Sequence, residues 1–184
     1  PHRRAAQRSN RLTEDTTSGT APSPGPDRPP ALNPAMIVAT WFGCGLAPKA
    51  PGTVGSLGAL PVAWIILSYW GWPWLAVAAV AATVIGIVAT AAVLRRSAVK
   101  DPSFVVIDEV AGQWIALLPA GLDPILFAVG FVAFRLFDIW KPWPVSWADR
   151  KVPGAVGVML DDLIAGGFAA ALVYGLGYAM AGGT

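Results

Sequence analysis

Seven charged side chains stand within or beside long apolar stretches, where a charge is costly unless it is paired or does chemistry. They are Asp108, Glu109, Arg135, Asp138, Lys141, Asp161 and Asp162. Carboxylates that lie close together repel one another, and two arrangements relieve the repulsion. Basic groups such as Lys49, Arg135 and Lys141 could neutralise them in a structural network. Alternatively, a hard divalent cation such as Mg²⁺ could bind them, since Mg²⁺ prefers oxygen ligands and commonly also binds a substrate phosphate.

Each acidic cluster also has an ordinary structural interpretation. Asp161 or Asp162 alone could cap a helix N-terminus. Arg135 and Asp138 are three residues apart, the spacing of an ion pair on a helix surface. The pair at 108–109 could mark the solvated start of a helix. Because only 13% of the chain is charged, three such clusters are hard to explain jointly in this way, and we favour a shared cleft.

Long uncharged runs must position these groups. Residues 50–94 contain no Lys, Arg, Asp or Glu. This run is long enough for two membrane crossings of about 20 residues each, joined at the aromatic turn 69–74. Residues 110–134 carry only Asp123 and predict a second helical hairpin that turns at 119–124.

A final uncharged stretch covers residues 163–184. The predicted fold is therefore all-α: a polytopic helical membrane protein with about five transmembrane segments, or four if one is re-entrant. The basic residues after position 34 all lie at one end of these hairpins, and the positive-inside rule places that end in the cytoplasm. They are Lys49, Arg95, Arg96, Lys100, Arg135, Lys141, Arg150 and Lys151.

Depth along the helices brings the polar groups to one layer. At about 1.5 Å per residue, Asp108 and Asp138 both lie roughly 20–25 Å from the second turn. Thr53 and Ser56 reach the same level on the first hairpin, and residues 161–162 open the last segment from the same side. We therefore expect the carboxylates, hydroxyls and cations to meet near the cytoplasmic boundary of the membrane.

The segment 46–56 leads into the first apolar run and suits an anion. Its two glycines let backbone amides approach, Thr53 or Ser56 can cap the helix, and Lys49 adds a mobile cation near the positive helix N-terminus. An ordinary turn with an N-cap is the alternative. The segment lacks the glycine and lysine order of a P-loop, so nucleotide binding is unsupported.

Composition excludes several function classes. Apolar residues make up 55% of the chain, and its charged fraction is well below the roughly 25% of a soluble domain. Residues 1–34 are rich in Pro and Arg and predict a disordered cytoplasmic tail, whereas 35–184 predict one transmembrane domain. The net positive charge belongs to the tail, so nucleic-acid binding is not indicated. The only histidine is His2 and the only cysteine is Cys44, which argues against histidine catalysis and excludes an internal disulfide.

Four blocks of sequence, in order, carry a family resemblance. They are residues 40–45 with 48–56, 107–114, 134–144 and 157–166. Together they resemble the phosphatidylglycerophosphatase A family of bacterial membrane lipid phosphatases, over 39–171. Trp41 and Cys44 stand where we expect small or variable residues, and the long tail is an addition.

The resemblance implies Mg²⁺-dependent hydrolysis of phosphatidylglycerophosphate to phosphatidylglycerol and inorganic phosphate, a step of glycerophospholipid biosynthesis. It implies a transmembrane phosphatase domain in the bacterial cytoplasmic (inner) membrane, with the active site facing the cytoplasm. The polar positions of the family's blocks are intact in this chain: Lys49, Thr53, Ser56, Asp108, Glu109, Arg135, Asp138, Lys141, Asp161 and Asp162.

On this basis we expect five carboxylates to be both catalytic residues and Mg²⁺ ligands: Asp108, Glu109, Asp138, Asp161 and Asp162. Substrate binding is expected of Lys49, Thr53, Ser56, Arg135 and Lys141. Glu109 would activate a water, and a covalent aspartyl-phosphate route stays open. Two other functions also stay open: a membrane phosphotransferase acting on a lipid headgroup, and a non-enzymatic cation carrier or scaffold. The oligomeric state is left open.

Overall fold

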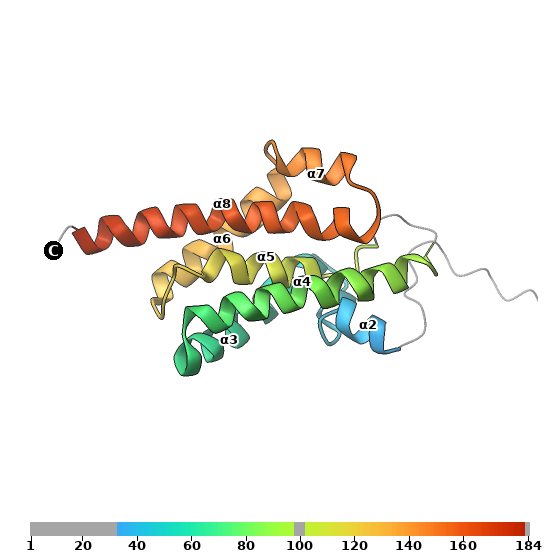
Figure 1. Ribbon diagram of the computed structural model, residues 1–184, viewed down its shortest axis with the longest axis horizontal. Coiled ribbons are helices and arrows are strands. Elements are labelled where there is room, and N and C mark those ends of the chain that lie inside the picture. Colours follow the sequence, from blue (N-terminus) through green and yellow to red (C-terminus); the bar gives the residue numbers. More distant parts are fainter. Residues whose placement is uncertain (1–32, 98–101, 183–184) are drawn as a thin grey trace, which may run out of the picture.

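The computed structural model describes residues 33–97 and 102–182, and every regular element in these ranges is a helix (Figure 1). The elements are α2 (Pro34–Ala39), the 3₁₀ helix η1 (Cys44–Leu46), α3 (Pro51–Trp70), α4 (Trp72–Leu94), α5 (Ile107–Leu117), α6 (Pro124–Trp140), α7 (Val145–Lys151) and α8 (Gly154–Gly182). The predicted helical class is confirmed for this part of the chain. The predicted disordered tail lies outside the described residues, apart from its last two positions.

The first hairpin is formed by α3 and α4. Proline at the first position of α3, Pro51, has a backbone already suited to a helix start. Gly71 ends α3 with φ 79°, a conformation that glycine adopts without strain. Its N–H donates to the carbonyls of Ile66 and Leu67, and α4 begins at the next residue. The turn falls within the predicted aromatic segment.

The second hairpin is formed by α5 and α6. Gly121, with φ 58°, turns the chain between them. Asp123 caps α6, because its carboxylate accepts the backbone N–H groups of Ile125 at 2.7 Å and Leu126 at 3.1 Å. The hairpin therefore turns where the sequence predicts. Helix α6 ends before Lys141, which has a left-handed backbone (φ 48°) and precedes a proline that disfavours continuing the helix.

Helix α5 lies at the centre of the bundle and packs against α3, α4, α6 and α8 (Figure 1). Its closest approach is to α8, at two glycines. A Cβ added at Gly112 would meet the backbone oxygen of Asp162 at 2.6 Å, and one added at Gly166 would overlap the Gly112 carbonyl. Small residues of this kind let two helix backbones approach closely. Because Asp108 and Asp162 each lie one turn before these glycines, this contact brings their carboxylates together.

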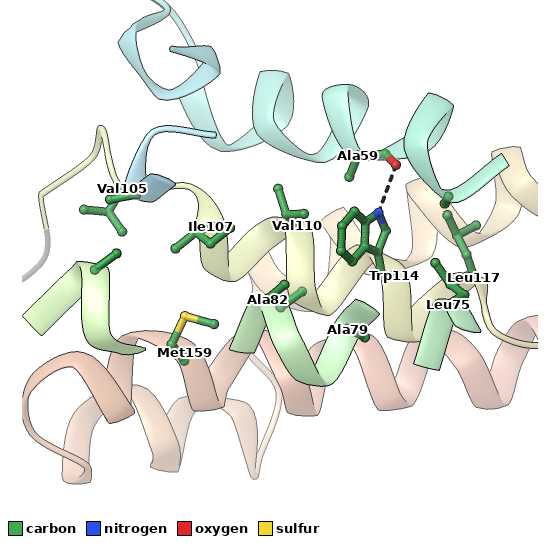
Figure 2. Packing of buried hydrophobic residues seen from close by; sticks show 14 of the residues in the cluster. Ala59, Leu75, Ala79, Ala82, Val105, Ile107, Val110, Trp114, Leu117 and Met159 are labelled. Carbon is green, nitrogen blue, oxygen red and sulfur yellow. Dashed lines mark hydrogen bonds between the residues drawn. The ribbon is translucent and has the colours of Figure 1, made fainter. Parts of the chain in front are cut away.

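The other side of α5 carries the apolar core. Ile107, Val110 and Trp114 belong to a buried cluster shared with α3 and α4 (Figure 2). The Trp114 indole Nε1 donates to the Ala59 carbonyl oxygen of α3 at 3.0 Å. This hydrogen bond satisfies the one polar atom of a large buried side chain. The core therefore fixes the rotation of α5, and with it the direction of its acidic first turn.

Three helices are long and apolar enough to cross a membrane: α3, α4 and α8, with 20, 23 and 29 residues. Helices α5 and α6, with 11 and 17 residues, are shorter than the roughly 20 residues of one crossing. The predicted count of four to five crossings is therefore not confirmed. The difference arises because α5 is enclosed by other helices and starts only at Ile107, after a buried loop at 104–106.

Candidate functional site: an acidic cavity at one end of the bundle

A polar cavity of about 500 Å³ opens where α3 and α8 begin, beside the first turn of α5 and the last turns of α6 and α7. Six carboxylates and three basic groups line it, an excess of three negative charges: Asp108, Glu109, Asp138, Asp149, Asp161 and Asp162, with Arg135, Lys141 and Arg150. Such an excess in one cavity favours the binding of a cation. All five predicted metal ligands and two of the predicted substrate-binding residues therefore face a common space.

Three of these carboxylates form the tightest group. One oxygen each from Asp108, Glu109 and Asp162 lies within 4.8 Å of the others. Asp108 and Glu109 occupy the first turn of α5, where the helix dipole favours negative charge. Asp162 belongs to α8, and the close contact between α5 and α8 at their glycines brings it to the other two carboxylates. The group could hold a metal ion, because hard divalent cations bind oxygen ligands drawn from separate elements.

Glu109 fits between α3 and α6. A Cβ at Gly52 would overlap the Glu109 Oε1 atom, so only glycine leaves room for this carboxylate. Arg135 Nη1 lies 3.9 Å from the same oxygen. The other oxygen, Oε2, is buried and has no hydrogen-bond partner among the described residues. An unpartnered buried carboxylate oxygen is costly without a ligand, so this donor set fits a metal ion.

Arg135 and Asp138 form the predicted short-range ion pair on α6, with Arg135 Nη1 2.6 Å from Asp138 Oδ2. The pair lies inside the cavity, so the ordinary structural interpretation and the functional one describe the same contact. Asp138 also lies near enough to Asp162 for the two carboxylates to interact electrostatically. Asp138 therefore links the guanidinium to the group of three carboxylates and is not one of that group.

Lys141 bridges two acidic residues from different elements. Its Nζ atom donates to Asp149 Oδ1 of α7 and to Asp161 Oδ2 of α8, both at 2.8 Å. Burial lowers the pKa of Lys141, but its hydrogen bonds to the two carboxylates outweigh burial and raise the pKa above its ordinary value. The ammonium therefore stays charged at neutral pH and anchors α7 against α8.

Asp161 and Asp162 do not cap a helix. Helix α8 begins at Gly154, so both lie two turns inside it, and the N-cap interpretation is wrong. The sequence predicts that residues 161–162 open the last segment, because a charged pair commonly marks the boundary of an apolar helix. Helix α8 continues through them because both carboxylates face the cavity rather than lipid.

Three predicted substrate-binding residues are absent from the described lining of the cavity: Lys49, Thr53 and Ser56. Ser56 is buried and donates to the Gly52 carbonyl of its own helix at 2.9 Å. Thr53 is half-buried, and Lys49 is exposed next to Ala50, which does line the cavity. The start of α3, rather than these side chains, contributes to the cavity wall.

Two residues that line the cavity are not among the site residues predicted from the sequence. Asp149 and Arg150 belong to α7, a short polar helix between two apolar ones. Depth along the transmembrane helices could not place them, because α7 folds back beside α8 (Figure 1). The sequence offers one signal for them as site residues: an acidic and a basic residue stand close in sequence to Lys141.

The fold and the cavity together define a class of protein: an α-helical bundle with three membrane-length helices and, at one end, an acidic cluster that could hold a metal ion. The family model described as Phosphatidylglycerophosphatase A matches residues 37–177. The chain therefore belongs to the phosphatidylglycerophosphatase A family, and it is a phosphatase.

Three individual proteins are similar to this chain, and two of them carry the name of the family. The Phosphatidylglycerophosphatase A of Escherichia coli (strain K12) is 39% identical over 148 residues, which cover 79% of this chain and 85% of the relative. The protein of the same name from Haemophilus influenzae is 33% identical over 151 residues, covering 81% and 92%. A Bacteroides thetaiotaomicron protein, provisionally named a phosphatidylinositol-3-phosphatase, is 36% identical over 146 residues, covering 75% and 90%. No solved structure matches the chain.

Proposed function

We propose that the protein hydrolyses phosphatidylglycerophosphate to phosphatidylglycerol and inorganic phosphate, in a Mg²⁺-dependent step of glycerophospholipid biosynthesis. The observation that carries the proposal is the gathering of Asp108, Glu109 and Asp162 within 4.8 Å in a cavity that also holds Arg135 and Lys141. Two relatives named Phosphatidylglycerophosphatase A support the choice of lipid.

Mg²⁺ would be held by Asp108, Glu109 and Asp162, with Asp138 and Asp161 as adjoining carboxylates. Bound there, it would supply polarisation of phosphoryl oxygens and a lowered pKa for a coordinated water. The choice of Mg²⁺ over a softer metal rests on the donor set, which is all oxygen. The buried Glu109 Oε2 and Asp161 Oδ1 atoms, which lack partners within the described structure, leave acceptor capacity for a cation.

The basic groups bind the phosphate of the substrate. Arg135 presents a guanidinium whose Nε is buried and unpartnered in the described part of the chain, and a guanidinium matches phosphate geometry with two parallel hydrogen bonds. Lys141 is held in place by Asp149 and Asp161 and contributes a fixed positive charge. Both groups offset the negative charge that develops on the phosphoryl oxygens during transfer.

The reaction breaks the bond between phosphorus and the glycerol oxygen. A water oxygen forms the new bond to phosphorus, Glu109 accepts a proton of that water, and the leaving glycerol oxygen takes a proton from solvent water to give phosphatidylglycerol. In the alternative route, an aspartate carboxylate forms the bond first and water later releases phosphate from it. Both routes give the same products and use the same cavity.

The cavity's position suits a lipid substrate. Large apolar side chains are exposed along α3, α4, α6 and α8, and Trp140 and Trp143 are exposed beside the cavity. Tryptophans of this kind favour the membrane–water interface. The acyl chains therefore stay in the leaflet and only the headgroup enters the site. We further propose a bacterial inner-membrane location with this end in the cytoplasm, and four to five crossings in which α5 and α6 form the shorter hairpin.

The experiment is phosphate release by the purified protein in detergent, from several lipid phosphomonoesters, with and without Mg²⁺. The proposal predicts that phosphatidylglycerophosphate is hydrolysed fastest and only with Mg²⁺. Faster hydrolysis of phosphatidylinositol 3-phosphate would overturn the choice of lipid. A new phosphodiester without free phosphate would indicate a phosphotransferase, and cation flux into vesicles without hydrolysis would indicate a carrier.

A further inference from the structure

Gln113 is a buried amide that the proposed reaction does not yet use. It lies in α5 with 0% of its surface exposed, and neither its Nε2 nor its Oε1 atom has a hydrogen-bond partner among the described residues. Buried side-chain amides are normally paired, and an exception requires a physical explanation. The requirement is stronger in a bundle with lipid around it, because hydrocarbon offers no partners.

The position of Gln113 relates it to one residue of the acidic cavity. Gln113 follows Glu109 by four residues on α5, so the two side chains share a face of the helix and lie one above the other. At about 1.5 Å per residue, Gln113 lies about 6 Å deeper in the bundle than Glu109. The Oε2 atom of Glu109 is itself buried and unpartnered within the described ranges. An amide and a carboxylate oxygen without partners therefore stand on consecutive turns of one helix.

One oxygen of the Glu109 carboxylate already has close neighbours. Its Oε1 atom lies against Gly52 of α3 and near Arg135 of α6, so those two contacts account for only one oxygen. The neighbouring residue of α5, Trp114, is fixed by its hydrogen bond to Ala59, which holds this part of α5 against α3. Gln113 follows on the next turn and is fully buried, so its amide cannot be satisfied by solvent.

We propose that Gln113 is a positioning residue: its amide N–H, which makes no hydrogen bond within the described residues, donates to the Glu109 carboxylate once a metal is held there and so fixes which oxygen faces the metal. The inference rests on the proposed metal site. Carboxylates that bind metals are commonly held by such hydrogen bonds, and removing the donor typically lowers metal affinity by about 10–100-fold. Gln113 touches neither substrate nor metal in this account and acts only through Glu109.

The test is equilibrium binding of Mn²⁺, an ion that prefers the same oxygen ligands as Mg²⁺, to the full-length protein in detergent, followed by electron paramagnetic resonance of free Mn²⁺. Gln113→Met keeps a similar shape without the amide and should weaken Mn²⁺ binding by about 10–100-fold. Gln113→Asn keeps an amide but shortens it, and should give an intermediate loss. Hydrolysis by Gln113→Met should recover at high Mg²⁺, because the metal ligands are intact.

Thr90→Val is the matched control. Thr90 of α4 is equally buried, and its hydroxyl has no partner within the described residues, but it is absent from the described cavity lining. Thr90→Val should leave Mn²⁺ affinity unchanged. A melting temperature for each metal-free variant shows whether it folds, and replacing an unpartnered amide by an apolar group of the same shape is not expected to lower it.

The possible results distinguish a failure of the role of Gln113 from a failure of the proposed function. If the wild type binds Mn²⁺, Asp162→Asn abolishes binding and folded Gln113→Met binds as tightly as the wild type, the role of Gln113 is wrong and the metal site stands. If the wild type binds no Mn²⁺, the metal site fails and the role of Gln113 fails with it. Weakened binding by Gln113→Asn, in a protein that melts like the wild type, supports the role even if Gln113→Met does not fold.

Discussion

The Glu109 carboxylate rests against the backbone of α3 at Gly52, where a methyl group would displace it. Gly52→Ala should therefore lower the rate of phosphate release by about tenfold or more, because the carboxylate must move away from the other two ligands. The cost in stability should be small, since the displaced atoms are the end of a flexible side chain. Assays of phosphate release and thermal unfolding check the two expectations together.

The control for Gly52→Ala is Gly175→Ala in α8. A Cβ at Gly175 would meet no described atom within 4 Å, so the rate should be unchanged and the helix slightly stabilised, by about 0.5–1 kcal/mol. If both variants released phosphate at the wild-type rate, the Glu109 carboxylate would not have the role in catalysis and metal binding that we propose.

Asp162 is the carboxylate that α8 contributes to the group of three. Asp162→Asn removes its charge without changing its size, and should reduce phosphate release at least about 100-fold through loss of metal binding. Asp123→Asn, at the N-cap of α6 far from the cavity, is the matched control and should retain the activity. If Asp162→Asn released phosphate at nearly the wild-type rate, the role of Asp162 would be structural only.

At the scale of elements, the contact between α5 and α8 determines where the acidic groups meet. A Cβ at Gly112 would meet the Asp162 backbone oxygen and the Phe134 ring, each at 2.6 Å. Gly112→Ala should destabilise the protein by about 1–3 kcal/mol and reduce activity as Asp108 and Asp162 move apart. Denaturation of the detergent-solubilised protein, alongside hydrolysis, gives both values.

Gly167→Ala, in the partner helix α8, provides the comparison for Gly112→Ala. Gly167 follows Gly166 directly, yet a Cβ there would meet no described atom within 4 Å. This variant should be as stable as the wild type or slightly more stable. If Gly112→Ala were as stable and as active as Gly167→Ala, the close approach of the two helices would not be what assembles the site.

Much of this arrangement could be predicted from the sequence, and the reasons are local. The turns at Gly71 and at Gly121–Asp123 follow from glycine, proline and cap residues, and equal depth from the second turn correctly brought Asp108 and Asp138 into one cavity. These features depend on spacing along one hairpin, which a sequence contains directly.

The rest depends on the path of the chain around the cavity and on competing hydrogen bonds, which residue spacing does not reveal. The pairing of Lys141 with Asp149 requires α7 to fold back, and no periodicity predicts that path. Ser56 was predicted at the right depth, but its hydroxyl bonds to the Gly52 carbonyl, since serine in a helix competes for backbone acceptors. The start of α8 was misplaced because a charged pair inside an apolar helix is tolerated where it faces a polar cavity.

At the scale of the whole molecule, we propose that the acidic cavity lies at the cytoplasmic end of the bundle. On a Cys44→Ser background, Arg96→Cys lies at that end and Leu122→Cys at the opposite end, and both positions are exposed. A membrane-impermeant maleimide added to intact spheroplasts should label Leu122→Cys alone, and should label Arg96→Cys only after permeabilisation. The reverse labelling pattern would place the cavity on the outer side.

The central claim is that a metal ion held between α5 and α8 enables this protein to release phosphate from a lipid. The most direct measurement is ³¹P NMR of phosphatidylglycerophosphate with the purified protein, first chelated and then given Mg²⁺. The account predicts no inorganic phosphate during chelation and steady release once Mg²⁺ is restored. Undiminished release throughout chelation would contradict it.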